Sequence, residues 1–156
     1  MKPNKKIFRI FLRALVILIG LSIIYGIYSN SLLFVNDRTI DYYEKLQELI
    51  VDKGYEDEIY VISGKRFKPI NDLLVKFGNA VRESRHLKGK AIDILVFDVN
   101  NDGKSNHEDV DLVYNILDRK VIKDRGGLGT YKNKSCFFTR QMIHFDSRGH
   151  KIRWNK

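Results

Sequence analysis

Two histidines and one aspartate stand at positions where their side chains could share a metal ion. His86 lies seven residues before Asp93 in the stretch SRHLKGKAID, and Asp93 interrupts the apolar run AIDILVF. His144 interrupts a second apolar run, MIHFD. A carboxylate buried without a partner is costly, so Asp93 requires one. Two imidazoles and a carboxylate form the ligand set of catalytic zinc sites. The spacing alone fits hydrogen-bonded core histidines and an ion-paired aspartate equally well.

A second pattern of metal ligands follows directly, in the stretch DVNNDGKSNHED at residues 98–109. Oxygen donors and a central glycine occupy the positions of a calcium loop, and the stretch resembles EF-hand and dockerin loops. The expected ligands are Asp98, Asn100, Asp102, Asn106, Asp109 and, through its backbone carbonyl, Lys104. Aspartate in place of the usual final glutamate predicts a modest affinity for Ca²⁺. A metal-free turn rich in Asp and Asn is the alternative.

Composition indicates one globular domain rather than a disordered chain or a disulfide scaffold. The chain has 156 residues, 44% of them hydrophobic, and one cysteine. Its net charge is +9, but five bases precede the first acid, Asp37, and the remaining 23 bases and 19 acids give only +4. This excess forms no nucleic-acid-binding stripe, so no nucleic acid is expected as a partner.

The N-terminal segment is apolar behind a basic cluster. No charged residue occurs from Ala14 to Val35, and 22 helical residues span roughly 33 Å, enough for a ~30 Å hydrocarbon core. The pattern predicts a cytoplasmic basic segment (1–13), a transmembrane signal anchor (14–35) and an exported domain (36–156). A cleaved secretory signal is the main alternative, although the segment ends without an Ala-x-Ala cleavage site, and a buried core helix is the third.

The exported part reads as a mixture of helices and strands. Apolar periodicity predicts helices at 37–53, 69–81 and 107–122, and strands at 59–62 and 91–97. Two or three more strands follow the glycines at 126, 127 and 129. The expected fold class is α+β, with a small, mainly antiparallel sheet and flanking helices, preceded by one N-terminal transmembrane helix.

The stretch SRHLKGKAID resembles the Ser-x-His-x-x-Gly-x-Ala-x-Asp signature of the zinc murein peptidases. That group, which has the Hedgehog/DD-peptidase fold, includes D-Ala-D-Ala carboxypeptidases, D-Ala-D-Ala dipeptidases and L-Ala-D-Glu endolysins. The stretches SGKR at 63–66 and GGLGTY at 126–131, and the ending through HFD to RW, are most similar to its compact periplasmic branch. The resemblance covers about residues 59 to 154.

The resemblance implies a zinc ion held by His86, Asp93 and His144. It assigns Arg66 to the arginine that helps to hold a substrate carbonyl or carboxylate, and it places Ser84 at the lip of the site, where it orders the loop. Zinc lowers the pKa of its bound water toward ~7 and polarises the scissile carbonyl, which suits peptide hydrolysis.

One position departs from the pattern of this group. Its better-known members carry Glu or Asp three residues before the second histidine, as the general base, where this chain has Gln141. An amide cannot accept that proton. Asp146, two residues after His144, is the nearest carboxylate in sequence and could be the base. It could also orient a histidine ligand or simply end a strand.

These observations together predict a membrane-anchored zinc peptidase whose catalytic domain lies outside the cytoplasmic membrane. It would hydrolyse a peptide bond in cell-wall peptidoglycan as a carboxypeptidase or an endopeptidase. Eight bases and two acids lie between Lys65 and Lys90, which favours the carboxylates of peptidoglycan stem peptides as partners. A catalytically inert, metal-bearing wall-binding domain and a calcium-dependent protein-interaction domain are the alternatives. The sequence does not indicate an oligomeric state.

Overall fold

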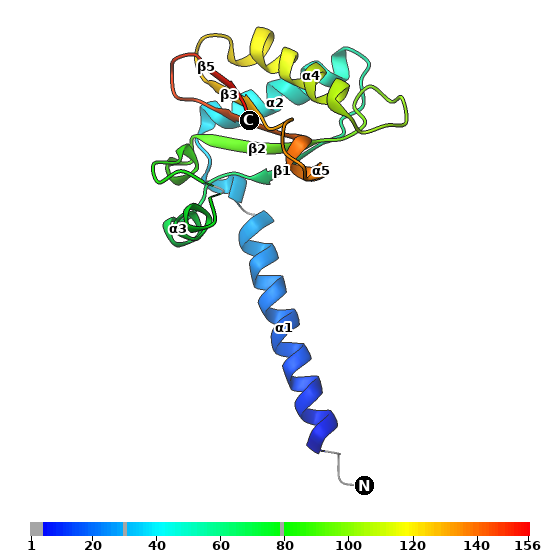
Figure 1. Cartoon of the computed structure of the whole chain (residues 1–156), viewed down its shortest axis with the longest axis vertical. Helices are drawn as coiled ribbons and strands as arrows, with labels where there is room; N and C mark the ends of the chain where they lie inside the picture. Colours follow the sequence, from blue (N-terminus) through cyan, green and yellow to red (C-terminus); the bar gives the residue numbers. More distant parts are fainter. Residues whose placement is uncertain (1–4, 30, 79) are drawn as a thin grey trace.

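Residues 5–29, 31–78 and 80–156 are described by a computed structural model of the chain (Figure 1). The α-helices are α1 (Lys5–Ser29), α2 (Asp37–Asp52), α3 (Lys68–Lys76), α4 (His107–Ile116) and α5 (Phe137–Arg140). Shorter helical segments are the 3₁₀ turns η1 (Ser31–Phe34) and η2 (Arg85–Lys88) and the π-helix η3 (Leu117–Ile122). The strands are β1 (Ile59–Ser63), β2 (Ala91–Val96), β3 (Gly127–Thr130), β4 (Met142–Asp146) and β5 (Ile152–Asn155).

The five strands form one sheet in the order β1-β2-β4-β3-β5. The pairs β1–β2, β2–β4 and β3–β4 are antiparallel, whereas β3 and β5 pair in parallel. The fold is therefore α+β with a mixed sheet. Its central strands β2 and β4 bring segments about fifty residues apart in sequence into direct register, with Asp93 opposite His144.

The two faces of the sheet differ in chemistry because strand side chains alternate in direction. Ile92 and Ile94 of β2 and Ile143 and Phe145 of β4 are fully buried and belong to the hydrophobic core. Residues of α2 and α4 complete this core, and both helices lie on the same side of the sheet (Figure 1). Asp93 and His144 alternate with these apolar residues and so face the opposite side.

Local side-chain chemistry sets where the helices begin and end. The Asn36 side chain accepts a hydrogen bond from the backbone N–H of Thr39 at the start of α2, as expected of an N-cap residue. The helix predicted at 69–81 ends earlier, at Lys76, because Gly78 adopts a left-handed conformation with φ +74°. The helix predicted at 107–122 has an α-helical part to Ile116 and then widens into the π-helix η3.

The prediction of a transmembrane signal anchor at 14–35 is wrong. The helix α1 includes bases of the N-terminal cluster, and its uncharged part is confined to residues 14–29. Sixteen helical residues span only ~24 Å, less than a ~30 Å hydrocarbon core. Within 5–29, 31–78 and 80–156, no helix combines the length and the apolar character needed to cross a membrane.

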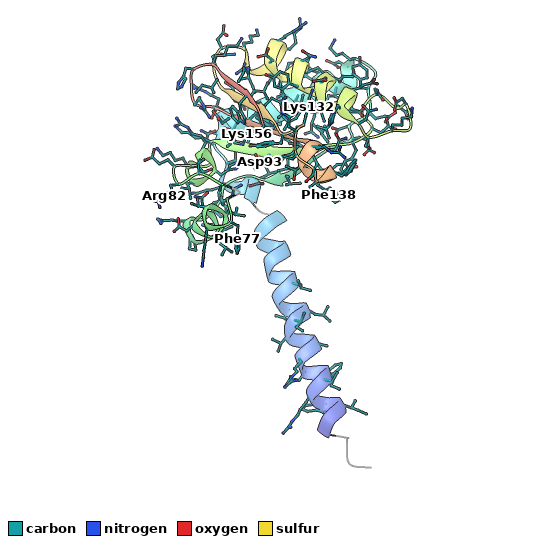
Figure 2. All side chains as sticks on the ribbon, in the orientation of Figure 1. Phe77, Arg82, Asp93, Lys132, Phe138 and Lys156 are labelled. Carbon is teal, nitrogen blue, oxygen red and sulfur yellow. The ribbon has the colours of Figure 1, made fainter. Side chains whose placement is uncertain are left out.

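The predicted membrane-anchored localisation and the predicted fold class with a transmembrane helix are corrected accordingly. Residues 31–35, which the prediction included in the anchor, instead contribute the 3₁₀ turn η1 and a buried core residue, Val35. The helix α1 extends away from the rest of the chain, and its described side chains project from it on several sides (Figure 2).

Candidate metal centre

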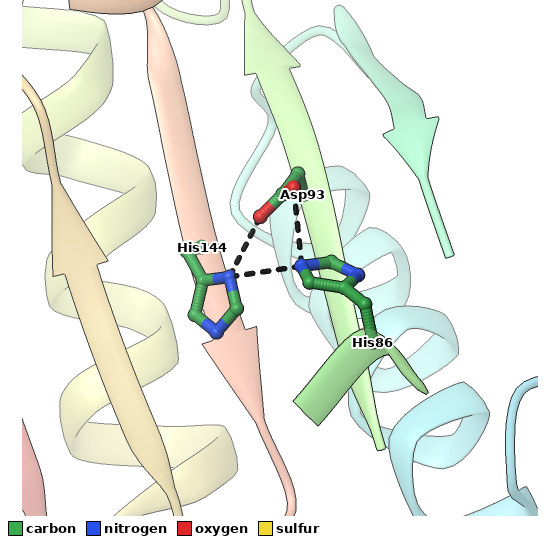
Figure 3. Close-up of side chains that lie close together, drawn as sticks. All are labelled: His86, Asp93 and His144. Carbon is green, nitrogen blue, oxygen red and sulfur yellow. Dashed lines mark hydrogen bonds and ion pairs between the residues drawn. The ribbon is translucent and has the colours of Figure 1, made fainter. Parts of the chain in front are cut away.

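The side chains of His86, Asp93 and His144 meet in one cluster (Figure 3). Asp93 Oδ2 lies 3.1 Å from His86 Nε2, and Asp93 Oδ1 lies 2.7 Å from His144 Nδ1. The two ring nitrogens, His86 Nε2 and His144 Nδ1, are 3.3 Å apart. All three residues are buried, and Asp93 lies in the middle of the folded domain, away from the exposed Arg82 and Phe138 (Figure 2).

The sheet and one tight turn position these three side chains. The β2–β4 register holds Asp93 and His144 opposite each other. His86 comes from η2, where the Ser84 hydroxyl accepts a hydrogen bond from the His86 backbone N–H at 3.3 Å. Gly89 ends this turn in the left-handed region at φ +62°, and a Cβ there would collide with the backbone of Phe34. The buried Ser84 therefore orders the loop that carries His86.

A backbone carbonyl fixes the tautomer of His86. Its Nδ1 lies 2.7 Å from the carbonyl oxygen of Gly64. Because that oxygen can only accept, Nδ1 carries a proton, and Nε2 is the ring nitrogen that faces Asp93. The backbone N–H of Arg66 donates to the His86 carbonyl at 2.9 Å, which ties the two segments together. His86 is thus held with Nε2 directed toward Asp93 and His144.

Asp146 supports His144 from the other side of its ring. Its Oδ2 lies 3.5 Å from His144 Nε2, so His144 lies between two carboxylates. Asp146 is fully buried and accepts hydrogen bonds from the backbone N–H groups of Gly127 and Arg148, both at 3.1 Å, and from the Arg148 guanidinium. With its oxygens engaged in this way, Asp146 is placed to orient His144 and leave Nδ1 facing the cluster.

The electrostatics of the cluster follow from these contacts. Burial acts to lower the pKa of His144, but its hydrogen bonds to Asp146 and Asp93 outweigh burial and raise the pKa to about 9. Burial acts to raise the pKa of Asp93, yet the charges and hydrogen bonds of His86 and His144 hold it well below its usual range. The two carboxylates therefore stay ionised around the imidazoles.

Arg66 lies beside the cluster. Its Nη2 is 3.5 Å from Asp93 Oδ2 and donates a hydrogen bond to the Ser63 hydroxyl at 3.1 Å. Its Nη1 lies 3.5 Å from Oδ1 of the buried Asn71. A guanidinium held in this position can offer N–H donors to a carbonyl or carboxylate that approaches the cluster.

Trp154 and two glycines of β3 complete the surroundings of His144, and the sequence did not identify their role. The Trp154 ring centre lies 5.3 Å from that of His144. Gly129 pairs with His144, and a Cβ at Gly129 would overlap the Trp154 ring. A Cβ at Gly127 would likewise collide with the side chains of Asp146 and Arg148. The alternating glycines of GGLGT were the only sequence signal that one face of this strand must stay bare.

Tyr131, at the end of the same glycine motif, responds electrostatically to the cluster. Burial raises the pKa of its phenol, the Asp93 carboxylate raises it further, and Trp154 and Arg66 act in the opposite direction. Its half-buried side chain keeps its proton at neutral pH and remains a hydrogen-bond donor. No role at the site was predicted for Tyr131 from the sequence.

Gln141 lies three residues before His144, at the position where the resemblance predicts Glu or Asp. Its side chain is almost completely buried, and its Nε2 has no hydrogen-bond partner among the residues that the structure describes. Its backbone carbonyl accepts from Val96 at 2.9 Å, which joins the start of β4 to β2. An amide in this position can donate a hydrogen bond but cannot take a proton from water.

The predicted calcium loop is compact, and its oxygens bond to the loop's own backbone. Asp98 accepts from the backbone N–H groups of Asp102 and Gly103, and Asn100 also accepts from Asp102. The remaining side-chain contacts involve Asp102, which accepts from Lys104 N–H, Asn106, which accepts from Glu108 N–H, and the buried Asp109, which accepts from Asn100 and Asn106 N–H. Calcium binding by this loop stays a prediction.

The ligand atoms of His86, Asp93 and His144 could hold a metal ion. They lie within 4.8 Å of one another, and in the described part of the chain no other group of three His, Cys, Asp or Glu residues does so. Two ligands of tetrahedral zinc, at ~2.0–2.1 Å from the ion, lie roughly 3.3 Å apart. The spacings of 2.7, 3.1 and 3.3 Å approach that value. The donors are two imidazoles and an ionised carboxylate, and binding of a metal ion would displace the proton that His144 carries at neutral pH.

The fold and site define an α+β domain with a buried two-histidine, one-aspartate cluster that could hold a metal ion. A scan against models of protein families finds no match, and a search of curated proteins finds none either. Among solved structures, the chain is similar to the crystal structure of Serratia marcescens L-Ala D-Glu endopeptidase ChiX. The identity is 14% and the TM-score 0.48, over 77% of this chain and 85% of that one.

Proposed function

We propose that the chain is a zinc-dependent peptidase that hydrolyses a peptide bond in cell-wall peptidoglycan. One observation carries the proposal: His86 and Asp93 of the murein peptidase signature converge with the downstream His144, and their ring nitrogens and carboxylate face a common centre. The hydrogen bond from His86 Nδ1 to Gly64 and the contact of His144 Nε2 with Asp146 direct the other ring nitrogen of each histidine inward. Such an arrangement suits coordination better than core packing.

The metal ion and the residues around it have separate roles in this proposal. A bound zinc ion would supply a Lewis acid and a water of lowered pKa. Arg66, 3.5 Å from Asp93, holds the substrate carbonyl or a terminal carboxylate. Asp146 keeps His144 oriented through the contacts described above. The carboxylates of peptidoglycan stem peptides match the excess of bases between residues 65 and 90.

A wall-binding domain without catalytic activity is the second candidate, and Gln141 favours it. An acid at this position would be the general base of the peptidases that the signature resembles, and the amide of Gln141 cannot replace it. Asp146 is fully buried and engaged with Arg148, which leaves it poorly placed to receive a proton from water. This candidate keeps the metal and the peptidoglycan ligand but lacks the hydrolytic step.

Digestion of purified peptidoglycan by the full chain separates the two candidates. The zinc-loaded chain is expected to release soluble muropeptides, and chelation or His144→Ala is expected to abolish the release. His107→Ala is the matched control, since His107 is exposed at the start of α4. Sedimentation of the chain with peptidoglycan, without release of fragments, would favour the binding domain instead. Absence of both release and binding would refute both candidates.

Substitution of Gln141 by glutamate sharpens the same test. Because a general base contributes about 10²- to 10⁴-fold to such reactions, Gln141→Glu is expected to raise muropeptide release at least tenfold if the chain is a weak hydrolase. Chromatography of the soluble products measures this increase. An unchanged rate would show that the missing acid is not what limits the wild-type chain.

A further inference from the structure

An open pocket of about 330 Å³ lies between α2 and η3, on the helical side of the sheet. It is lined by Arg38, Asp41, Tyr42 and Lys45 from α2 and by Lys120, Val121 and Arg125. The helix α2 covers the sheet face opposite that of Asp93 and His144. The pocket is therefore separate from the candidate metal centre, and ligand binding in it is independent of the function proposed for that centre.

The charge of this pocket is strongly positive. Four basic side chains and a single acid line it, which gives a local net charge of +3. Lys45 forms an ion pair with Glu48 at 2.7 Å. Arg38, Lys120 and Arg125 are exposed, and their side chains form no ion pair or hydrogen bond with any residue that the structure describes. Three cations therefore line one pocket without an anionic partner among the described residues.

Tyr42 lines the same pocket and adds an unpartnered donor. Its side chain is 7% exposed, and its hydroxyl has no hydrogen-bond partner in the described ranges. A buried hydroxyl left unpaired is unfavourable, and a ligand oxygen that accepts from it removes this penalty. The Tyr42 ring packs in the hydrophobic core, which holds the hydroxyl in place.

We propose that this pocket binds a phosphate group. A phosphate presents several oxygens around one centre, so it can accept from two guanidinium groups, an ammonium and a phenol together. A carboxylate has only two oxygens and cannot satisfy the same set of donors. Arginine forks bind phosphate in a bidentate manner, and Arg38 and Arg125 supply two of them. The phosphate is either a free ion or part of a phosphorylated polymer.

Calorimetric titration of the full chain at low ionic strength tests the proposal, with inorganic phosphate and soluble tripolyphosphate as separate probes. Saturable binding is expected, and the tighter probe distinguishes a free ion from a linear polyanion. Arg38→Gln/Arg125→Gln is expected to weaken binding by about tenfold or more, since hydrogen bonds to charged groups are the stronger ones. Arg82→Gln/Arg119→Gln, which removes two exposed arginines outside the pocket, is the matched control and should bind as the wild type does.

Tyr42→Phe provides a second, independent measurement. In phosphate-free buffer its melting temperature should equal or exceed that of the wild type, because the lost hydroxyl had no partner. Its phosphate affinity should fall about threefold. The proposal is overturned if the wild type gives no saturable heat with either probe. Equal losses in the pocket variant and the control variant would overturn it too, since binding would then reflect diffuse surface charge.

Discussion

Two regions of the chain carry the residue types of metal sites, and they are built in different ways. The cluster of His86, Asp93 and His144 is assembled by the sheet and a turn from three separated segments. The loop at residues 98–109 is a single continuous stretch. Both were predicted from the sequence as metal sites, yet only the first brings three His, Cys, Asp or Glu ligands together in the described structure.

The two regions differ in which groups form hydrogen bonds with their polar side-chain atoms. In the loop, Asp98, Asp102 and Asp109 accept hydrogen bonds from backbone N–H groups a few residues away. In the cluster, a carboxylate and two imidazoles are buried against one another inside the domain. The loop can thus fold as a set of Asx turns. The cluster instead buries a carboxylate and two imidazoles where apolar side chains would pack at a lower cost.

Loss of a ligand from the cluster is expected to have the largest effect. Asp93→Asn should lower zinc affinity by more than about 100-fold, the upper end for changes in residues that only support a ligand. Competition with a chromogenic chelator measures the affinity, and metal analysis should find one zinc per wild-type chain. Asp98→Asn, in the loop, is the control and should leave zinc affinity unchanged. Equal zinc binding by Asp93→Asn and the wild type would place the zinc elsewhere.

Asp146 is expected to have the next largest effect, and its substitution separates an orienting role from a catalytic one. Asp146→Asn keeps an oxygen that can accept from Gly127 but loses the charge that faces His144 and Arg148. Zinc affinity should fall about 10- to 100-fold. If Asp146 were the general base, the variant would instead retain its zinc and lose only peptidoglycan hydrolysis. Circular dichroism verifies that the compared variants are folded.

The sequence predicted the cluster because its residues lie in a specific motif and in apolar strands. Alternation in AIDILVF and MIHFD indicated buried strands with one polar side chain each, and the β2–β4 register then pairs these two side chains. The α+β composition of the domain could be inferred from the same periodicities. Local patterns of this kind report on a residue's own strand and neighbours.

What the sequence could not predict depends on contacts between distant segments. The order of the strands and the parallel pairing of β5 with β3 place Trp154 over Gly129 and beside His144. No local pattern around Trp154 specifies that contact. The prediction for the N-terminal segment was wrong for another reason. Its uncharged stretch includes η1 and Val35, which lie outside the helix α1 and belong to the domain. Hydropathy measured the apolar stretch but not where the helix ends.

Asp109 tests whether the loop is stabilised by hydrogen bonds rather than by an ion. Its carboxylate is buried and accepts from Asn100 at 3.1 Å and Asn106 at 2.9 Å, where it completes a capping box for α4. In calcium-free buffer, Asp109→Ala should lower the free energy of unfolding by about 1–2 kcal/mol. Urea denaturation measures the loss.

Asp111→Ala is the matched control for this variant, two residues along the same helix. Asp111 forms an exposed ion pair with Lys132, and such pairs contribute less than about 1 kcal/mol. A similar cost for both substitutions would contradict the idea that the buried hydrogen bonds of Asp109 hold the loop to α4.

Calcium binding is expected to have the smallest of the four predicted effects. Loops that end in aspartate and act alone should bind weakly, with dissociation constants of about 10⁻⁴–10⁻³ M. At a calcium concentration tenfold above that constant, binding adds about 1.4 kcal/mol, or roughly 4 °C in melting temperature for a chain of this size. Asp98→Ala should abolish the shift while zinc binding persists, because the two regions share no ligand. A melting temperature that ignores calcium in the wild type would show that the Asx turns of the loop are complete without an ion.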